Sequence, residues 1–257
     1  MPISLAHYPA VKTPSSASII LFPGWGFTRE CWQPLLHSLK EVSDVYALDI
    51  DYSGENLNQL CDAIAAILPE KMIALGWSLG GMLATRLASD YGDRVQGLIT
   101  LASNGVFVAN TQWVSAMEAS AFMKFSSQVR KNPDLGLKKF LSLQTLGDDQ
   151  AEQKKQWLQQ LPQDSNTDSL AQGLQILAKF NNVQRLSTIH CPGLHFLGAN
   201  DALVPNDAST LLRQQFGEQH KLITIAGAGH VLHFPQATII DHLSEFFSHL
   251  QHEVISD

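Results

Sequence analysis

Residues 72–81 read Met-Ile-Ala-Leu-Gly-Trp-Ser-Leu-Gly-Gly. An apolar run over 72–75 predicts a strand, and a helical pattern over 79–89 follows the Gly-x-Ser-x-Gly turn. A turn this sharp strains the backbone of its central residue, Ser78, so its neighbours must be small, and Gly76 and Gly80 meet that need. This strand–turn–helix context predicts a nucleophile elbow. The alternative is a glycine-rich turn in which Ser78 only caps the helix.

Strands and helices alternate on both sides of this turn. Apolar runs predict further strands at 18–22, 44–49, 95–101, 194–197 and 222–225. Helical spacing predicts helices at 28–40, with Thr28 as the N-cap, and at 56–68, 206–216 and 237–250. Continuously apolar strands that alternate with helices indicate an α/β fold, with a mostly parallel sheet covered by helices on both faces.

One long segment interrupts the alternation. Residues 107–178 contain no convincing strand pattern and read as several amphipathic helices. This segment is electrically neutral, so the remainder carries the whole net charge of −7. We expect residues 1–106 and 179–257 to form the α/β core and residues 107–178 to form a helical lid insertion. A separate helical domain is the alternative.

A serine hydroxyl needs a base to become a nucleophile, so we searched for an acid and a histidine after later strands. Asp201 follows the strand at 194–197, and His230 lies in the small-residue loop after the strand at 222–225. The chain order Ser78, Asp201, His230 matches a Ser-His-Asp triad. Asp207 and His233 are the alternatives for acid and base, although Asp207 is better placed to cap the helix that follows.

Acyl transfer also needs donors for an oxyanion. The backbone N–H of Leu79, directly after the nucleophile, is the first. We expect the second from Trp25, because the loop Pro23-Gly24-Trp25-Gly26 follows the first strand and can approach the elbow closely. The alternative is a tight turn with a tryptophan in the core.

Composition excludes several classes of protein. The chain has 257 residues, is 45% hydrophobic, and has no apolar run long enough to span a membrane. A net charge of −7 argues against nucleic acid as a partner. Three widely spaced cysteines form neither a disulfide framework nor a metal site. We therefore expect a cytoplasmic monomer without a signal peptide, a metal or an organic cofactor.

Together these residues resemble the α/β-hydrolase superfamily over nearly the whole chain. Within it, the chain is most similar to the family of pimeloyl-[acyl-carrier protein] methyl ester esterases of biotin synthesis. The segments that carry this resemblance are 24–26, 76–81, 140–147, 173–177 and 203–205. The stretch Phe-Leu-Ser-Leu-Gln-Thr-Leu-Gly at 140–147 is the most specific, because it lies in the variable insertion.

The resemblance implies a carboxylesterase that removes the methyl group from a pimeloyl thioester on acyl-carrier protein. It implies substrate contacts from Trp25, Ser78, Leu79, Phe140, Leu141, Ser142, Leu143, Gln144 and His230. Independently, helical spacing places Leu137, Phe140, Leu141 and Gln144 on one face, which could roof an apolar acyl tunnel.

An acidic carrier protein would dock against basic residues, and the insertion holds the densest group of them. The candidates are Arg130, Lys131, Lys138, Lys139, Lys154 and Lys155. Of the basic positions that the family uses, Lys139 is matched, whereas Leu135, Glu152 and Gln156 are not basic.

Two alternative functions use the same residues. A general short-chain carboxylesterase or a thioesterase would need the same triad, since each reaction passes through an acyl-serine and an oxyanion. A non-catalytic ligand sensor could also have this fold, because a fold does not by itself establish turnover.

Overall fold

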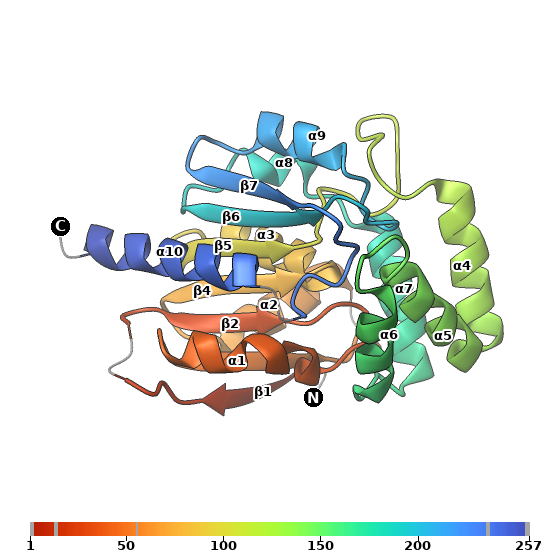
Figure 1. The fold of residues 1–257 in the computed structure, drawn as a ribbon, viewed down its shortest axis with the longest axis horizontal. Coiled ribbons are helices and arrows are strands. Elements are labelled where there is room, and N and C mark those ends of the chain that lie inside the picture. Colours follow the sequence, from red (N-terminus) through yellow and green to blue (C-terminus); the bar gives the residue numbers. More distant parts are fainter. Residues whose placement is uncertain (1–2, 13–14, 55, 235–236, 255–257) are drawn as a thin grey trace.

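The structure is a computed structural model that describes residues 3–12, 15–54, 56–234 and 237–254. Within these ranges a seven-stranded sheet has the order β1-β3-β2-β4-β5-β6-β7 (Figure 1). The strands are β1 (Ile3–Tyr8), β2 (Ser18–Phe22), β3 (Val45–Ile50), β4 (Met72–Trp77), β5 (Val95–Leu101), β6 (Gly193–Gly198) and β7 (His220–Ile225). All neighbouring pairs are parallel except β1 with β3. The predicted mostly parallel sheet is therefore confirmed.

The antiparallel edge strand β1 is absent from the sequence prediction. It pairs with β3 from Ile3–Ile50 to Tyr8–Val45. Ile3 is buried, but the rest of the strand is partly or fully exposed. An edge strand of this kind lacks the continuous apolar run by which buried parallel strands are found.

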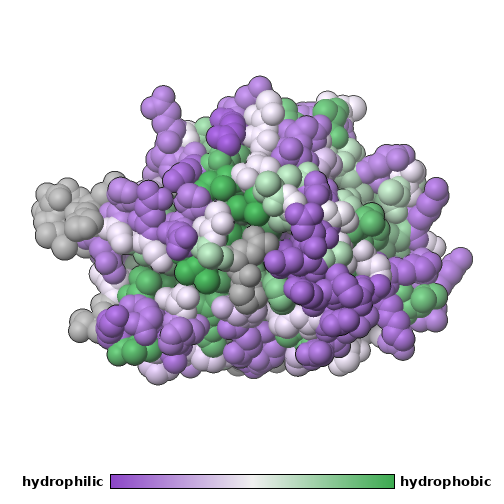
Figure 2. Space-filling view, in the orientation of Figure 1, coloured by the Kyte–Doolittle hydropathy of each residue, from purple (hydrophilic) through white to green (hydrophobic). Residues whose placement is uncertain are grey.

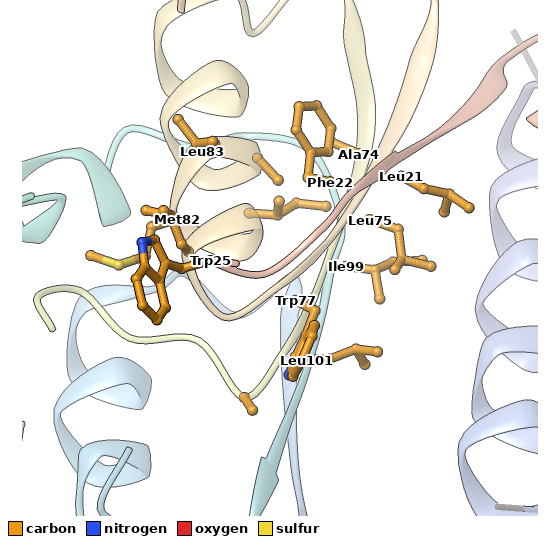
Figure 3. Packing of buried hydrophobic residues seen from close by; sticks show 14 of the residues in the cluster. Leu21, Phe22, Trp25, Ala74, Leu75, Trp77, Met82, Leu83, Ile99 and Leu101 are labelled. Atoms are coloured by element: carbon orange, nitrogen blue, oxygen red, sulfur yellow. The ribbon is translucent and has the colours of Figure 1, made fainter. Parts of the chain in front are cut away.

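Helices cover both faces of the sheet. In Figure 1, α1 (Gln33–Lys40) and α10 (Ala237–Val254) lie in front of the strands, and α2 (Leu57–Ile67) and α3 (Leu79–Asp90) lie behind them. The remaining core helices are α8 (Val183–Leu186), which packs on α3, and α9 (Ala208–Gln215), which packs on α8. Between these layers Leu21, Leu75 and Ile99 lie side by side in register and fully buried (Figure 3).

The predicted helix at 28–40 is divided into two elements. A 3₁₀ turn, η1 (Arg29–Trp32), precedes α1. Pro34 has no N–H to donate, so it suits the first turn of a helix and not its interior. Thr28 occupies the N-cap position of η1, but its side chain makes no capping hydrogen bond; its hydroxyl donates instead to the Pro162 carbonyl at 3.2 Å.

Residues 107–178, all of which the structure describes, form helices and isolated β-bridges but no strand. We call them the helical insertion. Its helices are α4 (Ala119–Lys131), α5 (Pro133–Gln144), α6 (Ala151–Gln160) and α7, which ends at residue 179 (Thr167–Lys179). They gather at one end of the sheet (Figure 1), and their buried side chains join the hydrophobic cluster of the α/β core. In the part of the chain that the structure describes, no helix is long and apolar enough to cross a membrane.

Candidate active site

The nucleophile elbow lies between β4 and α3. Ser78 has φ 55° and ψ −119°, a backbone conformation that residues other than glycine rarely adopt. A Cβ on Gly76 would overlap the Gly80 carbonyl, and one on Gly80 would overlap the Phe22 carbonyl. The backbone is thus packed so tightly that only glycine fits at these two positions. The Ser78 side chain makes no capping hydrogen bond to α3, so the helix-cap interpretation is wrong.

Asp201 and His230 meet at the carboxyl ends of β6 and β7. His230 Nδ1 and Asp201 Oδ2 are 2.7 Å apart, and both side chains are fully buried. The other carboxylate oxygen accepts the backbone N–H groups of Leu203 at 2.8 Å and Val204 at 3.0 Å. These bonds orient the carboxylate, which in turn orients the imidazole. Asp207 is exposed at the start of α9 and makes no side-chain cap.

The free imidazole nitrogen of His230 is Nε2. It is buried and has no hydrogen-bond partner within the described part of the chain, and no hydrogen bond there joins it to Ser78. Hydrogen bonds to a catalytic base are often long before substrate binds. The structure therefore brings the predicted acid and base, Asp201 and His230, into contact and leaves Nε2 available for a third group.

Trp77, the residue before Ser78, connects the elbow to the histidine loop, which we define as residues 226–233. Its Nε1 donates to the His230 carbonyl at 3.0 Å, and its ring lies 4.2 Å from that of His233. The rings of Trp32 and Trp157 also lie against His233. This role of Trp77 could not be predicted from the motif, because Gly-x-Ser-x-Gly leaves its second position unspecified.

His233, the alternative base, is fully buried among these tryptophans. Neither ring nitrogen has a partner among the residues that the structure describes. Burial is the main cause that lowers the pKa of His233 to about 3, and the charges of His230 and Lys154 lower it further. With no carboxylate bonded to it, His233 lacks the orienting group that His230 has.

The loop from Pro23 to Gly26 passes against the elbow, as its glycines predict. Leu79 is the first residue of α3, so its N–H has no acceptor within the helix. The N–H of Trp25 also lacks a hydrogen bond in the described structure. The Trp25 side chain is buried: Nε1 donates to the Leu170 carbonyl at 3.0 Å, and the ring packs edge-on against Phe140.

The predicted substrate-binding helix is α5. Leu137, Phe140, Leu141 and Gln144 are all buried, as their spacing predicts, and Gln144 Oε1 has no partner among the described residues. Ser142 is different: it is exposed, and its hydroxyl bonds back to the Lys138 carbonyl. Ser142 thus lies on the opposite face of α5 from Phe140 and Leu141, and its contact with substrate stays a prediction. Leu143 is half-buried.

The predicted docking residues divide into two groups. Arg130, Lys131, Lys138 and Lys139 are exposed, and Lys155 is half-buried. Lys154 is wrong as a docking residue, because it is fully buried in an ion pair with Asp148 at 2.7 Å. Sequence spacing could not separate it from Lys155, since only packing determines which side of α6 faces inward.

A groove between α4 and α5 contains Lys131, one of the predicted docking residues, together with several residues that the sequence analysis did not select. It is lined by Met123, Lys124, Ser127, Gln128, Lys131, Asn132 and Leu135. Met123 and Leu135 are large, exposed apolar side chains in this groove. Elsewhere the visible face of the helical insertion is mostly hydrophilic (Figure 2). Among the described residues no three His, Cys, Asp or Glu side chains form a metal-binding group.

Comparison with known proteins places this geometry in a family. Residues 19–240 match the model of the alpha/beta hydrolase family. The biotin biosynthesis bifunctional protein BioHC of Cellvibrio japonicus is 35% identical over 240 residues, which cover 90% of this chain and 48% of that protein. The pimeloyl-[acyl-carrier protein] methyl ester esterase of Vibrio parahaemolyticus is 33% identical over 216 residues, covering 80% of this chain and 84% of the esterase. The chain thus spans about half the length of the bifunctional relative and most of the other.

Solved structures agree on the fold. A bromoperoxidase from Bacillus anthracis superposes with a TM-score of 0.80 at 17% identity, over 95% of this chain and 94% of that one. An enol-lactonase from Burkholderia xenovorans superposes with a TM-score of 0.77 at 13% identity, over 99% and 96%. The strained serine between β4 and α3, the parallel sheet and these matches lead to one conclusion: the chain belongs to the alpha/beta hydrolase family.

Proposed function

We propose that this chain is a serine carboxylesterase in which Ser78 is the nucleophile, His230 the base and Asp201 the group that orients the base. The observation that carries the proposal is the buried 2.7 Å contact between His230 Nδ1 and Asp201 Oδ2, together with the strained backbone of Ser78. An imidazole held at Nδ1 presents Nε2, the nitrogen that can accept a proton from a serine.

In the proposed reaction Ser78 Oγ attacks the ester carbonyl and His230 Nε2 takes the serine proton. The N–H groups of Leu79 and Trp25 hold the oxyanion. The carbon–oxygen bond to the alcohol then breaks, and His230 returns the proton so that methanol leaves. Water, deprotonated by the same imidazole, releases the acid from Ser78. Asp201 stays ionised throughout and stabilises the imidazolium.

We further propose the methyl ester of pimeloyl-[acyl-carrier protein] as the substrate, which would place the enzyme in biotin synthesis. The names of the relatives at 30–35% identity support this choice. The buried apolar face of α5, with the unpartnered Gln144 Oε1, suits an acyl chain that carries one polar group. In this proposal the helical insertion acts as a lid over the site.

The test is a panel of pimeloyl, adipoyl and azelayl methyl esters, each free and bound to carrier protein, with Ser78→Ala as the control. We expect the highest kcat/KM for carrier-bound pimeloyl ester and almost none with Ser78→Ala. Equal rates on all chain lengths would indicate a general carboxylesterase, and preferred cleavage of the thioester a thioesterase. Binding of the esters without turnover would indicate a ligand sensor.

For the acyl-carrier protein itself we propose docking on the exposed basic residues Arg130, Lys131, Lys138 and Lys139, with Lys155 at the edge. Charge complementarity supports this, because carrier proteins are acidic and clustered charges steer association. Lys138→Glu with Lys139→Glu should raise KM for the carrier-bound ester about tenfold, or about 1.4 kcal/mol. Added salt should have the same effect, and the free methyl ester should be unaffected. Equal loss on both substrates would instead indicate damage to the acyl site.

We place the protein in the cytoplasm. All three cysteines are free, two of them buried, as in proteins of reducing compartments.

A further inference from the structure

The segment that joins α5 to α6, residues 144–150, makes three hydrogen bonds to the histidine loop. The backbone N–H of His230 donates to the Gln144 carbonyl at 3.0 Å, and that of Asp149 donates to the Gly227 carbonyl at 2.8 Å. The backbone N–H of Gly229 donates to Asp148 Oδ2 at 2.7 Å. Three residues of the histidine loop, including the base itself, are therefore bonded to the helical insertion.

Asp148 is the one side chain among these contacts, and it is almost fully buried. The same oxygen that accepts from Gly229 also accepts from Lys154 Nζ at 2.7 Å, and the other oxygen accepts from the N–H of Gln150 at 2.8 Å. Within the described part of the chain, Asp148 is the only hydrogen-bond partner of the Lys154 ammonium. A charge pair removed from water in this way contributes little net stability, so its geometry points to another use.

The site described above does not account for this pair. Among the described residues no hydrogen bond or ion pair joins Asp148 or Lys154 to Ser78 or Asp201, and both are too deeply buried to meet a carrier protein. Glycine at 227 and 229 makes the histidine loop conformationally permissive, so that an external contact must select its position. The bond from Gly229 to Asp148 acts one residue before the base.

We propose that Asp148 positions the catalytic base by holding the N–H of Gly229, and that Lys154 neutralises the charge of this buried carboxylate. The inference rests on the proposed triad and adds one positioning residue, Asp148, to it. It also means that the helical insertion, which supplies the acyl-binding face of α5, sets the direction of His230 Nε2 toward Ser78.

Two matched double variants test this. Asp148→Leu with Lys154→Met replaces the ion pair by apolar groups of similar size, a change that buried pairs often tolerate, but leaves Gly229 without an acceptor. Asp148→Asn with Lys154→Met removes both charges and keeps an oxygen for Gly229. We expect the first to lower kcat by about 10- to 100-fold with little change in KM for a small soluble ester, because a slightly misplaced base is costly. The second should retain most of the rate.

The concentration of active sites is measured by titrating the reactive serine with a covalent label, and kcat is calculated from that concentration. A smaller fraction of folded protein then does not lower the measured kcat. If Asp148→Leu with Lys154→Met does not fold, Asp148→Ala with Lys154→Met replaces it, since an alanine side chain has no acceptor for the Gly229 N–H. Wild-type kcat per labelled site in the acceptor-free variant, with an unchanged pH profile, would overturn the proposal.

A readout that needs no turnover separates this inference from the proposed function. The proton shared by His230 Nδ1 and Asp201 gives a far-downfield NMR resonance, assigned by its loss in Asp201→Asn. We expect it to broaden or vanish in the acceptor-free variant and to persist in the asparagine variant. If wild type hydrolyses no ester but the resonance behaves in this way, the proposed function fails and the positioning role stands. If wild type is an esterase and the resonance is unchanged in both variants, only the positioning role fails.

Discussion

Ser78 and His230 are held in different ways. Around Ser78 the backbone itself is the constraint, because the Gly80 and Phe22 carbonyls leave no space for a Cβ at Gly76 or Gly80. The loop that carries His230 is instead held by residues far away in the sequence: Asp201, Trp77, Gln144 and Asp148. The proposed nucleophile is thus positioned by close packing of backbone on backbone, and the proposed base by hydrogen bonds to segments distant in the sequence.

The largest effect should come from disconnecting the base. Asp201→Asn should lower kcat by about 10⁴-fold, because the amide favours the wrong imidazole tautomer, and His230→Ala should be at least as damaging. Steady-state kinetics on a p-nitrophenyl ester measure this. Asp207→Asn is the matched control, since Asp207 is exposed at the start of α9 and should leave the rate unchanged. If the Asp207 variant were the inactive one, the assignment of the acid would be wrong.

Replacing a glycine by alanine should lower the free energy of unfolding more at the elbow than in the histidine loop. Gly80→Ala places a Cβ into the Phe22 carbonyl, so we expect the free energy of unfolding to fall by about 3 kcal/mol. Gly229→Ala meets its nearest atoms, on Asp148 and Gln144, at 3.2 Å, and should cost less than about 1 kcal/mol. Urea unfolding of both variants gives the comparison. Equal losses would mean that the histidine loop is as tightly packed as the elbow.

The smallest effect should be a pH dependence of the free energy of unfolding that arises from His233 in the histidine loop. Burial lowers the pKa of His233 to about 3, whereas an unfolded histidine titrates near ~6.5. Between these values only the unfolded chain binds the proton, so the free energy of unfolding falls as pH falls below about 6.5. His233 should account for about 1.2 kcal/mol between pH 6 and pH 5.

The matched variant is His233→Phe, which keeps an aromatic ring among Trp32, Trp77 and Trp157 but cannot bind a proton. The difference in unfolding free energy between wild type and this variant should therefore change across that interval and stay constant above about pH 7. His195 and His220 provide the common background: burial lowers the pKa of both, that of His220 to about 4. Parallel pH profiles would show that His233 is protonated in the folded protein.

Features that depend on residue spacing could be predicted from the sequence, and features that depend on distant contacts could not. The elbow, the parallel strands and the buried face of α5 depend on residue spacing, and each was predictable from spacing alone. The edge strand β1 was not, because a half-exposed strand lacks a continuous apolar run. The Thr28 side chain makes no capping hydrogen bond, because its hydroxyl donates to the Pro162 carbonyl, a partner remote in the sequence.

By itself, then, the sequence determined the α/β alternation, the strained serine turn and the set of candidate acids and bases. Only the tertiary structure decided that Asp201 meets His230 while Asp207 stays exposed, that Ser142 is exposed, and that Lys154 is buried against Asp148. The physical reason is the separation in sequence over which each effect acts. Backbone sterics and periodicity act between residues a few positions apart, whereas the burial and pairing of a charge depend on which distant segments pack against it.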